Sequence, residues 1–362
     1  MNTQYDQIEA ESAFGFDGNW KDFARIALPN LLLTIVTLGI YRFWATTRER
    51  KYLWSHTRFV DERLEWTGTG KELFIGFLIV FAILGIPFFI IQLIANGLIF
   101  RGMLEWVGIM TLVIFAATYY LTGLAKFRAL RYRLSRTRWR GIRGGSDDQG
   151  FKYGWSYIWK SLVGTMALYL LIPWSMTSLW NERWSKMSFG PYKFEAYAES
   201  GNVFARFLLF YLAPIALIIL TAVSAFAGWG AGAAIGEGAE EVGLGAAFVI
   251  SMFVWFFVLG LIAAAFYAKF YREVIDKTLW HDLRFGFEAR TIDWIKLYVG
   301  DFFLVVLTLG VGIVFLSYRH WKFFVTHMEA GGDILLDELT QSTTATARHG
   351  EGLLDAFDIG AI

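Results

Sequence analysis

The sequence predicts a polytopic α-helical membrane protein, and three observations support this prediction. The chain has 362 residues, of which 56% are hydrophobic and only 18% are charged, whereas soluble domains carry about 25% charged residues. The apolar residues are gathered into long runs that contain no charge. A short motif recurs just after several of these runs. Together these features exclude a soluble enzyme, a disulfide-bonded secreted domain and a disordered chain.

Four apolar runs are long enough to cross a bilayer, whose core requires about 20 helical residues. They are Leu73–Ala95, Val107–Ala125, Phe207–Trp229 and Val242–Ala268. We expect these runs to form two long helical hairpins. Their sequences contain no Asp, Glu, Lys, Arg or His. This argues against a proton-coupled carrier or a voltage sensor, because both need ionisable groups at membrane depth.

Three further apolar runs are shorter or interrupted. They are Ile26–Tyr41, Ser161–Trp180 and Phe302–Tyr318, and each contains proline or glycine. Proline and glycine suit a kinked or re-entrant helix that does not cross the bilayer cleanly. We therefore predict three short kinked or re-entrant helical elements. Seven ordinary crossings remain the alternative.

The positive charges favour four crossings over seven. If only the four long runs cross, every one of the 33 Lys and Arg residues except Arg101 lies on one face of the membrane. If all seven cross, the charges are divided between the two faces, against the positive-inside tendency. The resulting division is an N-terminal cytoplasmic segment (1–21), a membrane domain with internal repeats (22–328) and an acidic, disordered C-terminal tail (329–362).

An internal repeat follows the apolar runs. The two strong copies are Arg48-x3-Tyr52-x4-Thr57 and Arg128-x3-Tyr132-x4-Thr137, and weaker copies begin at Lys269, Arg183 and Trp321. The spacing indicates a helix that leaves the membrane, ends at Ser or Thr and continues into a small β-hairpin. Five such units predict a ring or platform of cytoplasmic β-hairpins beneath the helices. A structural role for the motif is favoured, and a direct ligand role is the alternative.

A basic segment directly after the second long run carries the strongest charge feature of the chain. Its cations are Lys126, Arg128, Arg131, Arg133, Arg136, Arg138, Arg140 and Arg143, with no acidic residue among them. Basic clusters on the cytoplasmic side of a span attract anionic lipid headgroups, by about 1 kcal/mol per residue. These residues are therefore the candidates for lipid-headgroup binding, and orientation by the positive-inside rule is the alternative. Nucleic acid is not an expected partner, because the patch adjoins the membrane and has no recognisable reader fold.

Motifs for catalysis and metal binding are absent from the sequence. The chain has no cysteine, its five histidines are scattered without ligand spacing, and it has no phosphate-binding loop or nucleophile elbow. We therefore expect no catalytic residue, no metal, no cofactor and no enzymatic activity.

One string of residues resembles a known family. Thr37, Gly39, Tyr41 and Trp44 lie in Thr-Leu-Gly-Ile-Tyr-x-x-Trp, which is followed by Arg48, Tyr52 and Thr57. This pattern resembles the YjgN-like family of bacterial inner-membrane proteins, a domain-of-unknown-function family. The resemblance covers roughly residues 14–330. It implies a multi-pass protein of the bacterial inner membrane, and it implies no reaction, substrate or cofactor.

Two functional classes fit these features. Permeation, transport or lipid handling is favoured, because internal repeats with broken half-spans mark binding regions in transporters. The alternative is a membrane scaffold whose cytoplasmic β-hairpin platform binds a protein partner or anionic lipid. Membrane lipids, anionic ones included, are the expected partners in either case.

Overall fold

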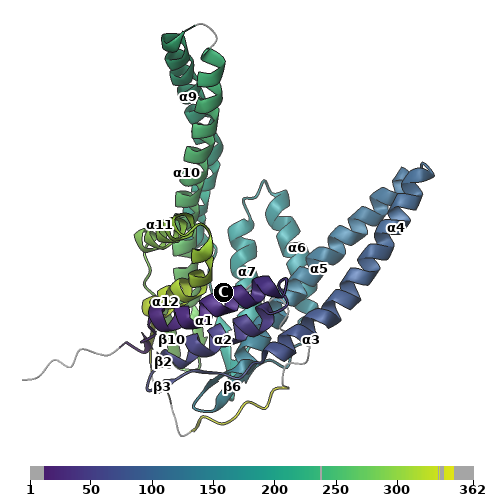
Figure 1. Ribbon diagram of the computed structural model, residues 1–362. Helices are drawn as coiled ribbons and strands as arrows, with labels where there is room; N and C mark the ends of the chain where they lie inside the picture. The colour runs from purple at the N-terminus through teal and green to yellow at the C-terminus, as the bar shows by residue number, and fades with distance from the viewer. Residues whose placement is uncertain (1–11, 237–238, 333, 335–337, 346–362) are drawn as a thin grey trace, which may run out of the picture.

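The computed structural model describes residues 12–236, 239–332, 334 and 338–345, in which five helical units alternate with short strands (Figure 1). The helices are α1 (Trp20–Val36), α2 (Arg42–Ser55), α3 (Gly70–Val80), α4 (Ile86–Phe100), α5 (Leu104–Arg136), α6 (Phe151–Met166), α7 (Ile172–Trp184), α8 (Gly201–Phe207), α9 (Ala213–Ile235), α10 (Glu240–Asp276), α11 (Thr291–Leu307) and α12 (Leu316–His327). A π segment, η1 (Phe81–Gly85), and two 3-10 segments, η2 (Leu208–Leu212) and η3 (Val311–Phe315), join some of them.

The strands follow one another in chain order as an antiparallel meander. They are β1 (Phe14–Phe16), β2 (Thr57–Phe59), β3 (Glu62–Arg63), β4 (Glu65–Trp66), β5 (Thr137–Trp139), β6 (Ile142–Gly145), β7 (Ser188–Phe189), β8 (Tyr192–Ala196), β9 (Thr278–Trp280), β10 (Leu283–Phe287) and β11 (Met328–Gly331). β1–β3 form one sheet and β4–β11 form the other. Only Leu64 separates the two sheets along the chain. The first and last strands also meet, and Ser12 Oγ donates to Glu329 Oε1 at 2.8 Å. The strands therefore close into a ring.

Connections between successive strands alternate between tight turns and helical units. Four turns of two residues, 60–61, 140–141, 190–191 and 281–282, close the hairpins. Their first residues have φ values from 51° to 58°, as two-residue hairpin loops require. Alternate connections of an antiparallel meander lie at opposite ends of the strands. All helical units therefore begin and end on one side of the ring, which Figure 1 shows below the helices.

Aromatic side chains fill the ring. Phe59, Trp139 and Trp280 are the third residues of β2, β5 and β9, and all three are buried. Trp139 Nε1 donates to the carbonyl of Phe59 at 2.9 Å, so adjacent units are joined through the core. The rings of Phe14 and Phe285 lie 6.3 Å apart and join β1 to β10. The predicted β-hairpins thus follow four of the helical units, and the fifth ends in the single strand β11.

Two helical units are long, and we call them the long pairs (α3 to α5 and α8 to α10). Among the described residues, three helices are long and apolar enough to cross a membrane, namely Leu104–Arg136, Gly201–Ile235 and Glu241–Asp276. The predicted span Leu73–Ala95 differs, because η1 divides it between α3 and α4. Pro87, the second residue of α4, lies two residues after this π segment. It has no N–H for the preceding turn, and a π turn relieves the resulting clash.

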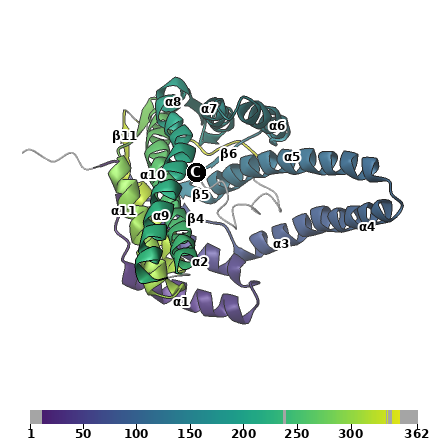
Figure 2. The same ribbon diagram turned by 90° about the horizontal axis from the view of Figure 1, so that it is seen from above.

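The other three units are short, and we call them the short pairs (α1 with α2, α6 with α7, and α11 with α12). Each short apolar run was expected to form a kinked or re-entrant helical element, and in the structure each run contains a turn at which the chain reverses and returns to the ring. Ile26–Tyr41, for example, comprises most of α1 and the turn that follows, after which α2 returns to the ring. Gly39 and Gly310 stand at the chain reversals, whereas Pro29 lies inside α1 and Pro173 lies in the first turn of α7. Figure 2 shows the units arranged around the strands.

Part of the predicted C-terminal tail is packed against the ring. Its first residues belong to β11, which pairs with β10. Further along, Gln341 Nε2 donates to the carbonyl of Gly141 at 3.0 Å, and Ser342 and Thr344 are buried. Gln341 thus forms hydrogen bonds with backbone groups of the ring. The acidic composition of the tail does not predict this packing. Residues 1–11 of the N-terminal segment and 346–362 of the tail lie outside the described residues.

Candidate membrane-insertion site

The first short pair ends in a turn built by the Thr-Leu-Gly string. Thr37 Oγ1 donates to the carbonyl of Leu33 at 2.7 Å and accepts from the backbone N–H of Tyr41 at 2.9 Å. Leu38 has φ 50° and Gly39 has φ 91°. Both residues are in the left-handed region, which reverses the chain at a helix end. The threonine therefore caps α1 and fixes the start of α2.

The fifth helical unit repeats this turn. Thr308 Oγ1 donates to the carbonyl of Leu304 at 2.6 Å and accepts from the N–H of Gly312 at 2.6 Å. Leu309 has φ 51° and Gly310 has φ 91°. The partial recurrence of the string, without its tyrosine and tryptophan, thus preserves the residues that make the turn. The structural function of the string lies in its Thr-Leu-Gly part.

The tips of all three short pairs expose apolar side chains. Leu38 and Leu309 are each 94% exposed, and Leu168, at the tip of the α6–α7 pair, is 75% exposed. No Asp, Glu, Lys or Arg lies within the three short apolar runs that contain these leucines. Exposed apolar patches without charge mark contact with a membrane or another protein. Three such tips on the same side of the ring make up the candidate site.

The helices of the short pairs do not have the length to cross a bilayer. α1 and α11 each have 17 residues and α6 has 16, which corresponds to about 25 Å at a rise of 1.5 Å per residue. A hydrocarbon core is about 30 Å thick, and the first turn of α1 is polar, with Lys21 and Asp22. The apolar part of each short pair is therefore shorter than a single crossing.

A polar contact clasps the two helices of each short pair. The contacts are Asn30 Nδ2 to Glu49 Oε1 at 3.4 Å, Lys160 Nζ to Glu182 Oε2 at 2.6 Å, and Asp301 to both Arg319 Nε at 2.5 Å and His320 Nε2 at 2.6 Å. Asn30 and Asp301 occupy equivalent positions, seven residues before the capping threonine. Both are buried. A buried polar group is stable only when it is paired, so these contacts fix the separation of the helices below the tip.

These clasps were not predicted from the sequence. Asp301 directly precedes the apolar run Phe302–Tyr318, where it is taken for a boundary residue. Arg319 and His320 lie beyond the other end of the same run. A signal is available in the alignment of the two Thr-Leu-Gly strings. In this alignment Asp301 corresponds to Asn30, and His320 corresponds to Glu49.

Most of the predicted lipid-headgroup residues contact other parts of the protein. The contacts are Lys126 Nζ with Tyr157 Oη (3.2 Å), Arg128 Nε with the carbonyl of Gln149 (3.3 Å), Arg131 Nη1 with Gln149 Oε1 (3.1 Å), Arg136 Nη2 with Glu72 Oε1 (3.1 Å), Arg143 Nη2 with the carbonyl of Ser342 (3.3 Å), and Arg140 with Asp61. Arg133 is half-buried and Arg138 is exposed.

These cations do not form one patch. On α5, successive basic residues point in different directions because a helix turns about 100° per residue, and Arg131 is fully buried. In the ring, the hydrogen bond from Arg140 lowers the pKa of the Asp61 carboxyl. Burial, with the nearby Arg136 and Arg138, lowers the pKa of Arg143. These basic residues are close together in the sequence but do not form a single basic surface.

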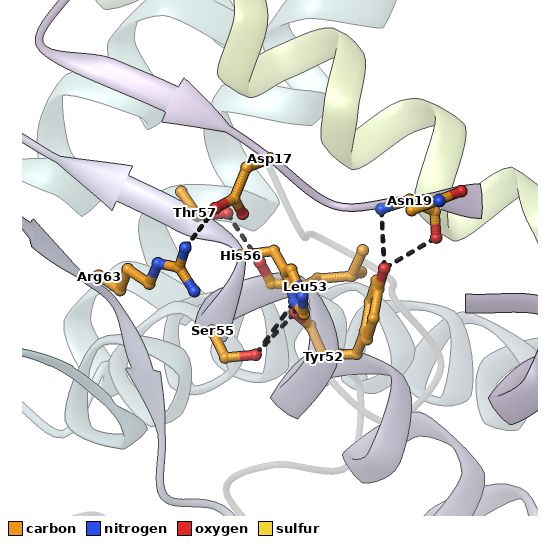
Figure 3. A network of polar contacts seen from close by, with 8 residues as sticks. All are labelled: Asp17, Asn19, Tyr52, Leu53, Ser55, His56, Thr57 and Arg63. Carbon is orange, nitrogen blue, oxygen red and sulfur yellow. Dashed lines mark hydrogen bonds and ion pairs between the residues drawn. The ribbon is translucent and has the colours of Figure 1, made fainter. Parts of the chain in front are cut away.

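The family-motif residues of the first unit bind one another and the start of the chain. The Arg48 guanidinium lies 5.5 Å from the ring centre of Tyr41, which stacks on Trp44. Tyr52 Oη donates to the carbonyl of Asn19 at 2.8 Å and accepts from its N–H at 2.9 Å (Figure 3). Tyr52 thereby connects the last turn of α2 to the start of α1.

The second unit uses its copy of the motif in a related way. Tyr132 Oη donates to Glu72 Oε2 at 3.3 Å, so this tyrosine connects α5 to the first turn of α3. Thr137 Oγ1 donates to the carbonyl of Arg133 at 2.9 Å, as Thr57 does to that of Leu53 at 2.8 Å. In both copies the tyrosine joins the two ends of its unit, and the threonine ends the helix.

Tryptophan side chains link neighbouring units through these threonines, which the sequence did not predict. The hydrogen bonds run from Trp321 Nε1 to Thr57 Oγ1 (2.8 Å), from Trp54 Nε1 to Thr137 Oγ1 (2.9 Å) and from Trp180 Nε1 to Thr278 Oγ1 (3.3 Å). The threonine recurs at a constant place in the repeat, but its donor does not. No fixed spacing therefore identifies the tryptophans. In the described part of the chain, no group of three or more potential ligand side chains is arranged to hold a metal ion.

Comparison with known proteins places the chain among bacterial membrane proteins. Residues 11–356 match the family described as "Bacterial protein of unknown function (DUF898)". The inner membrane protein YjgN of Salmonella typhimurium is 26% identical over 43% of this chain and 37% of its own length. The YjgN of Escherichia coli O157:H7 is 29% identical over 36% of this chain and 30% of its own length. The matches thus span about a third of these relatives. No solved structure matches the chain.

Proposed function

Because the chain belongs to the bacterial family of unknown function DUF898, whose relatives named above are inner-membrane proteins, we propose that this inner-membrane protein handles lipid. The three short pairs enter the cytoplasmic leaflet part of the way and return. The two long pairs cross the bilayer and anchor the ring beneath it. Three charge-free tips of less than spanning length are the observation that carries this proposal.

Chain connectivity supports this topology. Every helical unit leaves the ring and returns to the same side of it. This connectivity favours an even number of membrane crossings for each unit and argues against a single crossing by any short run. With the long pairs crossing twice, Arg101 lies on the outer side and the ring is cytoplasmic, in agreement with the positive-inside rule.

Lipid suits this architecture better than a soluble substrate. The predicted spans contain no ionisable side chain to coordinate an ion or a charged solute. Short apolar wedges occupy one leaflet only, so lipids around them must thin or tilt to cover the mismatch. Such thinning shortens the path of a headgroup between leaflets. The protein therefore promotes lipid movement at its short pairs.

Lipid movement in liposomes tests this proposal. Purified full-length protein in vesicles of phosphatidylethanolamine and phosphatidylglycerol should speed the transbilayer exchange of a fluorescent lipid, followed by dithionite quenching. We expect the triple variant Leu38→Glu, Leu168→Glu, Leu309→Glu to lose this activity. The matched variant with alanine at the same positions should keep most of it, since its tips stay uncharged. Exchange no faster than in empty vesicles, or equal activity in both variants, contradicts the proposal.

Reporter fusions test the topology separately. Reporters after residues 70, 150, 200, 290 and 340 should be cytoplasmic, and reporters after 100 and 235 should be outside. An outside signal at both 200 and 290 would establish seven crossings instead.

A scaffold function is the second candidate, and the underside of the ring favours it. The four tight turns lie on the face away from the helices, where Gln341 contacts one of them at Gly141, and Arg138 is exposed at the same ring. In this function the face binds a protein partner or anionic headgroups. Retention of a partner by protein that leaves lipid exchange unchanged would favour it.

A further inference from the structure

An open groove lies where the last helical unit meets the first. It has a volume of ≈ 520 Å³ and lies between the start of α1, α11, η3 and α12. Leu297, Leu304, Phe315 and Phe323 supply most of its wall. Two cations, Arg319 and Lys322, also line it. The groove is thus apolar along its wall and carries charge at a few atoms.

The polarity of the groove changes along its length. α11 runs from the ring to the tip, so Leu304 lies nearer the tip than Leu297. α12 returns to the ring, so Phe315 lies nearer the tip than Lys322. Trp20 begins α1 on the ring side and is 57% exposed. Tryptophan is enriched at the membrane–water interface. The apolar end therefore points toward the tip and the charged end toward the ring.

The charged end carries an excess of positive charge. Arg319 is held by Asp301 through its Nε, at 2.5 Å, and by the carbonyl of Leu297 through its Nη2, at 3.3 Å. His320 also contacts Asp301, on its other oxygen. Within the described residues, Lys322 forms no ion pair. The carboxylate of Asp301 is thus occupied by Arg319 and His320, and the ammonium of Lys322 is available to an anion.

We propose that this groove binds one anionic phospholipid of the cytoplasmic leaflet. The headgroup phosphate lies at Lys322 and Arg319, and an acyl chain follows Leu297, Leu304 and Phe315 toward the tip. The order of charge and apolar surface matches the order of groups in such a lipid. A phosphatidylcholine headgroup fits less well, because its own cation meets Lys322. This inference rests on the cytoplasmic orientation given under the proposed function and names the lipid class that the protein handles.

Native mass spectrometry of the full-length protein in detergent tests the site. We expect the parent to bind dioleoylphosphatidylglycerol more tightly than dioleoylphosphatidylcholine. Lys322→Gln should weaken phosphatidylglycerol binding by about fivefold, the effect of one interfacial charge, and should leave phosphatidylcholine binding unchanged. Lys296→Gln is the matched control, because Lys296 is on α11, 73% exposed and outside the groove. It should bind both lipids as the parent does.

A second variant tests the apolar end. Leu304→Trp fills the groove and should weaken the binding of both lipids, with thermal melting to verify the fold. Because Lys322 is exposed, its substitution keeps the test decisive if Leu304→Trp does not fold. Equal binding of the two lipids by the parent, or equal losses in Lys322→Gln and Lys296→Gln, overturns the proposal. Selective binding by a protein without lipid-exchange activity would contradict the proposed function and leave the site intact.

Discussion

The long and the short helical pairs leave the same ring, yet different forces hold them together. In the long pair of α9 and α10, Gly228 and Gly243 bring the two backbones into direct contact, and a Cβ at either position would strike the other helix. In the short pairs, polar side chains clasp the helices. A pair that crosses hydrocarbon gains stability from close packing of small residues. A pair whose base stays near the interface keeps charged groups at lower cost.

The largest effect is expected from a substitution that breaks the packing of α9 against α10. Gly243→Leu should force α9 and α10 apart and destabilise the protein by about 3 kcal/mol, the upper range for overpacking. Thermal melting and folded yield in detergent measure this. Gly245→Leu is the control, because open space surrounds that position on the same helix. Equal stability of the two variants would show that the close approach does not hold the pair.

The next largest effect is expected from a substitution that breaks the polar contact between the two helices of a short pair. Asp301→Ala should destabilise the protein by about 2 kcal/mol, because it removes two hydrogen bonds to a buried carboxylate and leaves the charge of Arg319 without its carboxylate partner. Asp22→Ala removes an exposed ion pair with Arg25 and should change stability little. Chemical denaturation of the two variants provides the comparison. A loss of stability no greater than that of Asp22→Ala contradicts the structural role of the clasp.

A smaller effect is expected from a variant that breaks the hydrogen bond between a short unit and its long neighbour. Thr137→Val removes the acceptor of the Trp54 indole, which joins the first unit to the second, and should cost about 1 kcal/mol. Thr122→Val on α5, the helix that precedes Thr137, removes only a bond to the carbonyl of Thr118 and should be close to neutral. Melting temperature and the fluorescence of the Trp54 environment should both change only in the first variant.

The smallest effect is expected in the ring itself. Arg140 lowers the pKa of Asp61, so this pair stabilises the folded state above the unfolded carboxyl pKa of about 3.9 and the stabilisation is lost as pH falls through the lowered folded value. Asp61→Asn should therefore lower the melting temperature slightly at pH 7. Parent and variant should converge below about pH 4. A difference that grows as the pH falls has the wrong sign for this pair.

Much of the architecture was predictable from local patterns. The Thr-Leu-Gly strings place two chain reversals, and the Thr-x-aromatic repeat places buried residues such as Phe59 and Trp139. The basic segment was less informative. Arg131 is buried and Arg136 binds Glu72, because the geometry of α5 distributes neighbouring residues around the helix. A count of charges along the chain does not contain this information.

The sequence by itself determined that this is a helical membrane protein with five related units and β-hairpins after the helices, because hydrophobicity and turn formation are local properties. Tertiary structure alone decided that the hairpins close into a ring. It also decided that Asp301 meets Arg319 and that Trp321 meets Thr57. These contacts join residues far apart along the chain, and packing selects them through geometry that no local spacing records.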